Sequence, residues 1–336
     1  MTDGIYTVAN DVVYNQLVAL LNSIEVNVGK HVPVCVIAYD DRLDLVRPEI
    51  AKRENVTLLE DPNLFKPWED FSQRVWQTHP TIWKIWQEKG IEGVYRIGMN
   101  RRYFAFDEAA PFEKFAYFDA DVLVLNSLDL IFNSLNEQDF VVYDFQYKDP
   151  SHIYNLNSEK IFQIFPQERI ESEIFCAGFY AGKRGILTQK KLDNIIFHLA
   201  AGESEILYPS APNQSVLNYA IMRSHIPVYN IALQYPKDKT TGCAAVSLHF
   251  QEKNHVLFDR GNQLTYLHYI GVSTKLFNRL CAGENLECPY RDLFLHYRYL
   301  YEPENRPKFT GKPKPYNPPP SLTTRILRKL GLKKIN

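Results

Sequence analysis

Two carboxylates interrupt an apolar stretch of the chain. The run from Phe115 to Leu125 (FAYFDADVLVL) is hydrophobic on both sides of Asp119 and Asp121. Because side chains two residues apart on a strand point to the same face, the two acids would lie side by side. Two ionised carboxylates at this spacing repel each other and are costly to bury, so a cation is expected between them. Mn²⁺ or Mg²⁺, which prefer oxygen ligands, would meet this need.

The Asp-x-Asp pattern by itself also fits a strand end whose acids are solvated or cap a helix. In this sequence the acids stand at a break in an apolar run, and an α/β sheet binds its ligands at the carboxyl ends of its strands. A metal held there would neutralise the charge that develops on a departing diphosphate. The pair therefore predicts phosphate chemistry assisted by a metal.

A third candidate ligand, His268, ends a strand-like segment (LTYLHYI) that is followed by Gly271 and Lys275. Neutral imidazole is a good Mn²⁺ ligand, glycine lets a phosphate approach the backbone, and lysine supplies positive charge to that phosphate. The same pattern fits a histidine that is hydrogen-bonded in the core. The chain has nine histidines, so position alone does not choose among them.

The segments that must position these side chains alternate between strand and helix patterns. Apolar runs predict strands at 4–9, 33–39, 55–59, 115–125, 140–143, 173–181 and 264–270. Helical spacing of apolar residues predicts helices at 12–24, after the cap Asn10-Asp11, and at 191–200 and 214–223. This order of elements predicts a parallel, doubly wound sheet. The four tryptophans fall within 61–98, which is either a packed helical cap or an aromatic wall facing a substrate.

Composition sets limits on the class of protein. The chain has 336 residues, of which 45% are hydrophobic, and a net charge of −1, so no global field attracts it to nucleic acid. No secretory signal and no 18-residue apolar run are apparent. The five scattered cysteines fit neither a disulfide framework nor a zinc-ligand spacing. A reducing, cytoplasmic location is expected.

The C-terminal part differs from the rest in composition. We expect a helical extension over 281–301 and a linker over 302–320, which is rich in proline. The tail, 321–336, has five basic residues and no acid, with Leu322, Ile326 and Leu330 at helical spacing. Such a segment suits peripheral contact with an anionic membrane on the cytoplasmic side, although a solvated terminus fits as well.

In this order, the motifs resemble those of the family 8 glycosyltransferases, retaining enzymes of the GT-A fold that include glycogenin and bacterial lipo-oligosaccharide galactosyltransferases. The resemblance covers most of residues 4–276. Its most specific part is Arg102: the family has an Arg 17 positions before the first acid of Asp-x-Asp, and 119 − 102 = 17. An Arg there would bind the diphosphate or the donor sugar through charge-assisted hydrogen bonds, and the neighbouring Arg101 is the alternative.

The resemblance also implies the remaining site residues. Asp119, Asp121 and His268 would hold the metal, and Gly271 and Lys275 would meet the phosphates. The nucleotide would further contact Thr7, Ala9, Asn10, Asp11, Tyr14 and Ala120, with Tyr14 stacking on the base. Ala177, Asn213 and Gln214 would line the sugar, with Asn213, Gln214 and Arg102 as the catalytic set.

Four departures from the family pattern bear on the mechanism. Cys176 stands where the family has Asn, and Asn213 stands where it has Asp. One extra residue precedes Tyr14, and another precedes Lys275. An amide can bond a sugar hydroxyl but cannot supply the full negative charge of a carboxylate. A non-catalytic sugar-nucleotide-binding protein is therefore an alternative. A nucleotidyltransferase is a weaker one, because no Gly-rich phosphate loop follows the first strand.

The expected protein is a metal-dependent hexosyltransferase that uses a nucleotide sugar, with UDP-sugars favoured, and a saccharide or lipid-linked acceptor. The expected fold is a GT-A-like domain over 1–280, with a mixed, mostly parallel sheet flanked by helices.

Overall fold

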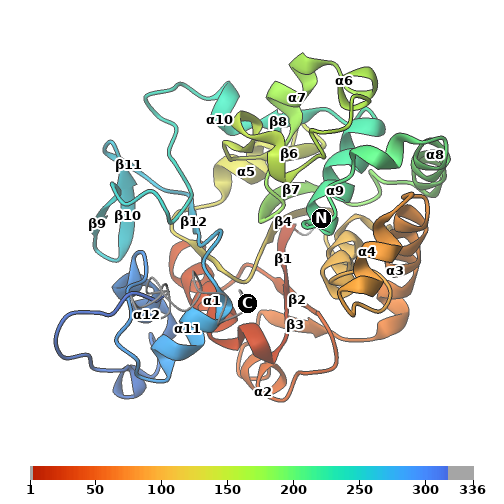
Figure 1. The fold of residues 1–336 in the computed structure, drawn as a ribbon. Coiled ribbons are helices and arrows are strands. Elements are labelled where there is room, and N and C mark those ends of the chain that lie inside the picture. Colours follow the sequence, from red (N-terminus) through yellow and green to blue (C-terminus); the bar gives the residue numbers. More distant parts are fainter. Residues whose placement is uncertain (1–2, 317–336) are drawn as a thin grey trace, which may run out of the picture.

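A mixed seven-stranded sheet forms the centre of the protein (Figure 1). The structure is a computed structural model and describes residues 3–316. The strand order is β3-β2-β1-β4-β7-β6-β8. The bounds are β1 (Asp3–Ala9), β2 (Val34–Ala38), β3 (Val56–Leu59), β4 (Lys114–Phe118), β6 (Phe140–Val142), β7 (Phe179–Lys183) and β8 (Val228–Asn230). Only β7 runs antiparallel to its neighbours within this sheet, so the predicted mixed, mostly parallel architecture is confirmed.

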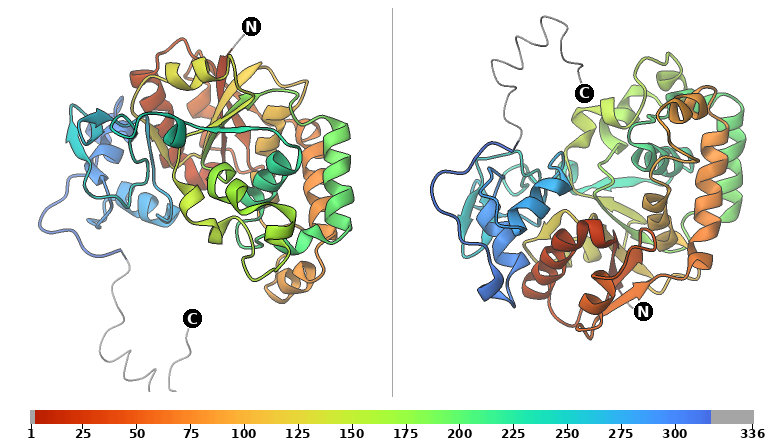
Figure 2. Two further views of the ribbon diagram at one scale, coloured as in Figure 1. Left: turned by 90° about the horizontal axis from the view of Figure 1, so that it is seen from above. Right: turned by 60° about the horizontal axis from the view of Figure 1, so that its bottom comes forward.

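The sheet is buried on both faces because its strands are apolar at consecutive positions. In β1, Tyr6 and Val8 join one core, while Ile5 and Ala9 join the other. Helices on the first face are α3 (Pro62–Gln77), α4 (Ile82–Glu88), α6 (Ile161–Ile164), α7 (Gln167–Glu173), α8 (Gln189–Ala200) and α9 (Pro212–Arg223). Helices on the second face are α1 (Tyr14–Asn27), α2 (Val46–Ile50), α5 (Asp129–Ser134) and α10 (Ile231–Gln234). Figure 2 shows α3 and α8 side by side at the outer edge of the first layer.

Short 3₁₀ segments connect these elements. They are η1 (Asp11–Val13), η2 (Ile97–Phe106), η3 (Gln146–Lys148), η4 (Pro150–His152), η5 (Glu203–Ile206) and η6 (Pro303–Asn305). The side chain of Asn10 caps η1 by accepting a hydrogen bond from the Val12 backbone N–H at 3.1 Å, as the sequence predicts for this helix start.

The tryptophan-rich segment is a packed helical cap and not a substrate-facing wall. Trp68, Trp76 and Trp86 are buried, and Trp83, at the start of α4, packs against the same core. Trp76 and Trp86 lie with ring centroids 5.2 Å apart. The aromatic rings of this segment therefore serve the core.

The strand predicted over 115–125 is in fact two strands joined by a turn. β4 ends at Phe118, and β5 (Val122–Val124) leaves the main sheet to pair antiparallel with β12 (Tyr266–His268). Val122 donates its N–H to the carbonyl of Asp119 at 3.1 Å, which closes the turn. The two acids therefore do not share a strand face as predicted. Similarly, the strand predicted over 173–181 begins only at Phe179: α7 extends to Glu173, and a turn at Ala177 and Gly178 precedes the strand.

The C-terminal part packs onto the N-terminal helix. It contains β9 (Gln251–Lys253), β10 (Val256–Asp259), β11 (Asn262–Gln263), α11 (Thr274–Cys281) and α12 (Arg291–Arg298). Helix α12 lies against α1, where Asn22 donates its side-chain N–H to the carbonyl of Tyr297 at 2.7 Å (Figure 1). Leu293 and Phe294 are fully buried in a core that also takes in Ala19 of α1. The expected extension over 281–301 is thus continuous with the core of the main domain.

The described part of the proline-rich segment begins with η6 and is anchored to the residues before it. Lys314 donates its N–H to the carbonyl of Asn285 at 2.9 Å and forms a bridge with Leu286. The guanidinium of Arg291 lies 4.9 Å from the ring of Phe309. The predicted basic tail, 321–336, lies outside the described residues. No helix in the 3–316 range is both long and apolar enough to cross a membrane.

Candidate metal centre and active site

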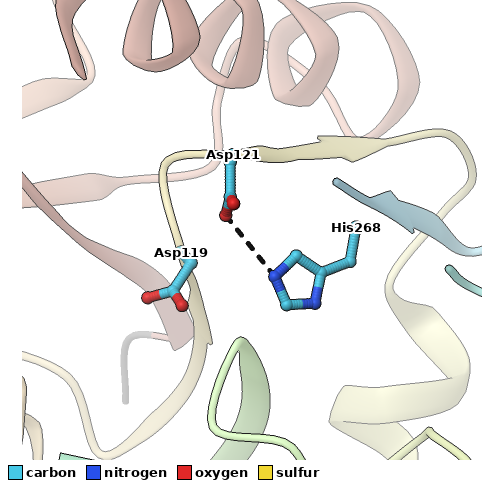
Figure 3. Close-up of side chains that lie close together, drawn as sticks. All are labelled: Asp119, Asp121 and His268. Carbon is cyan, nitrogen blue, oxygen red and sulfur yellow. Dashed lines mark ion pairs between the residues drawn. The ribbon is translucent and has the colours of Figure 1, made fainter. Parts of the chain in front are cut away.

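Strand pairing brings the three predicted metal ligands together. Asp119 follows β4 directly, and its N–H donates to the carbonyl of Gly178 at 2.9 Å. In the β5–β12 pair, His268 lies opposite Val122, and Tyr269 donates its N–H to the carbonyl of Asp121 at 3.0 Å. Figure 3 shows Asp121 and His268 facing each other, with Asp119 beside them and its carboxylate turned away from the imidazole. One ligand atom from each lies within 4.8 Å of the others.

The donor set fits a divalent cation. The side chains of Asp119 and Asp121 are 24% and 25% exposed, so the acids are open to a ligand, whereas His268 is only 9% exposed. Within residues 3–316 this is the sole group of three acidic, histidine or cysteine ligands close enough to hold a metal. Two carboxylates and one imidazole suit Mn²⁺, and Mg²⁺ less well because of the nitrogen ligand. The geometry thus supports the predicted ligand set.

The charges of His268 and Asp121 are coupled. Burial opposes the charged form of each group, but their mutual attraction across 3.5 Å outweighs it. The pKa of His268 is therefore raised well above its usual range, and the pKa of Asp121 is lowered. A proton on His268 supplies positive charge beside the two acids. A divalent cation bound there would supply that positive charge instead.

Arg102 lies behind the first acid of the pair. Its guanidinium is fully buried and donates to Asp119 at 2.8 Å, to the carbonyl of Ala177 at 2.7 Å and to the carbonyl of Met99 at 3.0 Å. It also lies over the ring of Tyr117 at 4.5 Å. Burial alone would lower the pKa of Arg102, but the charge of Asp119 outweighs it and the pKa is raised. The expected direct contact with donor phosphates does not fit a side chain with no exposed surface.

Arg101, the alternative to Arg102, is also engaged within the protein. It pairs with Glu69 at 2.6 Å and donates to the carbonyl of Ala38 at 2.8 Å. Its side chain is 17% exposed. Of the two arginines, it is therefore Arg102, the one with the family's spacing from the first acid, that supports Asp119.

The expected nucleoside segment lies at the end of β1. Thr7 and Ala9 are buried, and the hydroxyl of Thr7 has no hydrogen-bond partner among the described residues. Asn10 donates its side-chain N–H to the carboxylate of Asp40 at 3.0 Å. Asp11 accepts from two backbone N–H groups at the start of α2, at 3.0 and 3.1 Å. Asn10 and Asp11 therefore fix the loop that follows β2 beside the end of β1.

Tyr14 is placed at the contact between α1 and α12. The guanidinium of Arg298 lies over its ring at 5.3 Å, and its hydroxyl reaches the carboxylate of Glu49 at 3.5 Å. These contacts give the ring a structural partner, and nothing in them supports the expected stacking on a base.

The expected sugar-lining residues form a braced segment. Ala177 donates its N–H to the side chain of Gln214 at 2.9 Å, and Gln214 donates to the carbonyl of His152 at 3.2 Å. Asn213, the first residue after Pro212 in α9, is 8% exposed. The hydroxyl of Tyr103 donates a hydrogen bond to the backbone carbonyl of Asn213 at 2.7 Å. The Asn213 side chain makes no hydrogen bond to any described residue, so its amide is free for a ligand.

The remaining predicted residues flank the ligands. Ala120 lies in the turn between the two acids and is 7% exposed. Gly271 adopts φ +77° in an open turn, a conformation that favours glycine. Lys275 is exposed in the first turn of α11 and, among residues 3–316, has no ion-pair partner. No contact joins Lys275 to the three ligands.

Sequence reasoning missed Asp144, which follows β6. It is buried and accepts hydrogen bonds from the backbone N–H groups of Gln146 at 2.7 Å and Cys176 at 3.1 Å. Burial raises the pKa of Asp144 to about 7. Its position just after an apolar strand, like that of Asp119, was a signal that the sequence carried.

Comparisons with known proteins are consistent with this architecture. No protein-family model matches the sequence, and no curated protein matches it. Among solved structures, the apo form of the bifunctional glycosyltransferase WbbM is similar with a TM-score of 0.56 and 12% identity, over 91% of this chain and 52% of that one. The chain thus spans about half the length of WbbM.

Two further structures are similar at lower scores. Mouse xyloside xylosyltransferase 1 in its apo form has a TM-score of 0.49 and 7% identity, over 68% of this chain and 85% of that one. Galactosyltransferase LgtC in complex with donor and acceptor sugar analogs has a TM-score of 0.47 and 14% identity, over 87% and 100%. The fold assignment rests on WbbM: the chain has the GT-A-like fold of a glycosyltransferase, as the resemblance implied.

Proposed function

We propose that the chain is a metal-dependent glycosyltransferase that moves a sugar from a nucleotide sugar to an acceptor hydroxyl. The observation that carries this proposal is the convergence of Asp119, Asp121 and His268 within 4.8 Å at the carboxyl end of β4, in a fold of this class. UDP-sugars are the favoured donors, and a saccharide or a lipid-linked glycan is the favoured acceptor.

Asp119, Asp121 and His268 would hold Mn²⁺ or Mg²⁺. When bound, the metal would supply a Lewis acid that neutralises negative charge on the departing nucleoside diphosphate. Arg102 and Tyr117 orient Asp119 through two hydrogen bonds to the same carboxylate oxygen, each 2.8 Å long. This bracing keeps one acid in position before the donor arrives.

The other residues bind and orient. The free amide of Asn213 suits a hydrogen bond to a hydroxyl of the donor sugar. The exposed ammonium of Lys275 suits a phosphate that lies near the turn at Gly271. The expected transfer retains the stereochemistry of the sugar linkage, as in the family that the chain resembles. Because Asn213 cannot supply a full negative charge, it is not assigned the role of a charged group in that transfer.

Release of UDP tests the proposal. Wild-type protein is incubated with a panel of UDP-hexoses and Mn²⁺, and slow hydrolysis or transfer is followed by the UDP released. Release should be lost in Asp121→Asn and kept in the matched control Asp129→Asn, which changes an exposed acid of α5.

Two other results would redirect the assignment. Thermal stabilisation by a UDP-sugar without any release would favour a non-catalytic sugar-nucleotide-binding protein. Release of pyrophosphate from a nucleoside triphosphate would favour a nucleotidyltransferase.

We also propose that the basic tail, 321–336, gives the enzyme a peripheral contact with anionic lipid on the cytoplasmic side. Each basic residue near such a surface contributes about 1 kcal/mol, and the tail has five. Full-length protein should sediment with vesicles rich in phosphatidylserine at low salt, and a chain ending at Pro320 should not. Equal behaviour of the two at low salt would remove this proposal and favour a soluble acceptor.

A further inference from the structure

The second ring nitrogen of His268 faces a thiol. Nε2 points toward Asp121, and Nδ1 lies 3.9 Å from the sulfur of Cys176, a residue that is 8% exposed. No other side-chain partner of Nδ1 occurs among residues 3–316. The resemblance assigned position 176 to the lining of the sugar, where the family has Asn, whereas the thiol is in contact with a metal ligand.

Neighbouring side chains hold Cys176 in place. The carboxylate of Asp144 accepts the Cys176 N–H at 3.1 Å. On one side, Asn218 bonds both the N–H and the carbonyl of Phe175 at 2.9 Å. On the other, Gln214 bonds the N–H of Ala177, whose carbonyl accepts from Arg102. The sulfur is therefore presented from a segment that is fixed at three consecutive residues.

Gly178 completes the seat of the imidazole. A Cβ at this position would lie 2.1 Å from Cε1 of His268 and 2.8 Å from both ring nitrogens. The ring thus lies directly on the Gly178 backbone, which limits its tilt, while the contacts to Cys176 and Asp121 limit its rotation.

We infer that Cys176 is a positioning residue of the metal site, an inference that rests on the proposed function. With a metal bound in place of the proton on Nε2, the imidazole is neutral and carries one N–H. With Nδ1–H donated to the sulfur of Cys176, the lone pair of Nε2 faces Asp121 and serves as the metal ligand. Without this acceptor the other tautomer becomes accessible, and its hydrogen occupies Nε2. Partners of this kind fix the tautomer and orientation of ligating histidines.

Mn²⁺ binding, measured by the electron paramagnetic resonance signal of the free ion, tests the inference without any turnover. Loss of a group that orients a metal-ligating histidine typically lowers metal affinity by about 10-fold to 100-fold, so this loss is expected for Cys176→Ala. Cys176→Ser retains a hydrogen-bond acceptor and should recover part of the Mn²⁺ affinity that is lost in Cys176→Ala. Cys35→Ala, which removes a buried thiol from β2, should bind as the wild type does.

A tautomer measurement separates orientation from general damage to the fold. In protein labelled with ¹⁵N-histidine and loaded with diamagnetic Zn²⁺, the His268 signal, identified with His268→Gln, should show a protonated Nδ1 and a metal-bound Nε2. In Cys176→Ala that signal should broaden or show both tautomers.

Wild-type affinity in Cys176→Ala, or metal bound through Nδ1 in the wild type, would overturn the role of Cys176 while leaving the metal site standing. Absence of Mn²⁺ binding in the wild type would instead overturn the metal site itself, and the role of Cys176 with it.

Discussion

One carboxylate oxygen of Asp119 accepts hydrogen bonds from Arg102 and from Tyr117, and the guanidinium of Arg102 also lies over the Tyr117 ring. These three residues form a buried unit with the acid at its partly exposed end. The sequence identified Arg102 through its spacing from Asp119. Spacing could not reveal that the side chain points into the core, because this depends on how η2 packs beneath β4 and β7.

The bracing of Asp119 predicts a large cost for removing Arg102. Arg102→Ala should lower the free energy of unfolding by about 3–5 kcal/mol, as expected when a buried ion pair loses one partner. Arg101→Ala, which breaks a more exposed pair with Glu69, should cost about 1 kcal/mol or less. Urea denaturation of both variants measures this difference, and similar losses would contradict the supporting role of Arg102.

Asp144 predicts a pH dependence of stability. Burial raises its pKa from 3.8 to about 7, although backbone hydrogen bonds and the charge of His268 lower it. The folded protein therefore binds a proton more tightly than the unfolded chain. The stability contributed by this proton is fully present below the unfolded pKa and is lost as the pH rises through the folded value.

Between about pH 5 and about pH 8, the free energy of unfolding of the wild type should fall by about 2 kcal/mol more than that of Asp144→Asn. Groups that titrate in both proteins cancel in this comparison. Parallel curves of stability against pH for the two proteins would show that Asp144 is not a buried acid with a raised pKa.

At the scale of elements, apolar runs predicted β1, β2, β3 and β6 closely, together with α8 and α9. The strands are largely apolar along their length, and the two helices carry apolar residues at helical spacing, so local patterns were enough to identify them. The break between β4 and β5 could not be predicted in this way, because β5 is equally apolar but pairs with β12, which is distant in sequence. That long-range register is also what selects His268 from the nine histidines.

The approach of β12 to the segment before β7 predicts a strict requirement for glycine. Gly178→Ala places a methyl group 2.1 Å from the His268 ring, so the ring or β12 must shift, and Mn²⁺ affinity should fall at least about 10-fold. Gly182→Ala is the matched control in β7: its nearest atoms, in the rings of Phe106 and Phe115, lie at 3.3 Å.

Gly182→Ala should lower stability but leave Mn²⁺ binding unchanged, because it is remote from the turn at Asp119. Titrations that measure free Mn²⁺ in the presence of each variant test this difference in affinity. Wild-type Mn²⁺ affinity in Gly178→Ala would mean that the ring is not held by this contact.

For the whole molecule, the sequence pattern identified a mixed α/β sheet with its ligands at the strand ends, and the structure confirms that class. It did not reveal that the C-terminal helices complete a core shared with α1 and β5. Composition marks 302–320 as proline-rich, but packing of residues such as Phe309 depends on where Arg291 and Leu286 lie after folding. The metal centre itself combines the turn after β4 with β12, which lies much later in the chain.

The most direct test of the metal site is calorimetric titration of UDP, and of GDP in parallel, with and without Mn²⁺. The wild type should bind a nucleoside diphosphate in a manner that depends on Mn²⁺. Asp119→Asn and Asp121→Asn should each lose this dependence while keeping the circular dichroism spectrum of the folded protein. Equal metal-dependent affinity in the wild type and in both variants would contradict the assignment of Asp119, Asp121 and His268 as the metal centre.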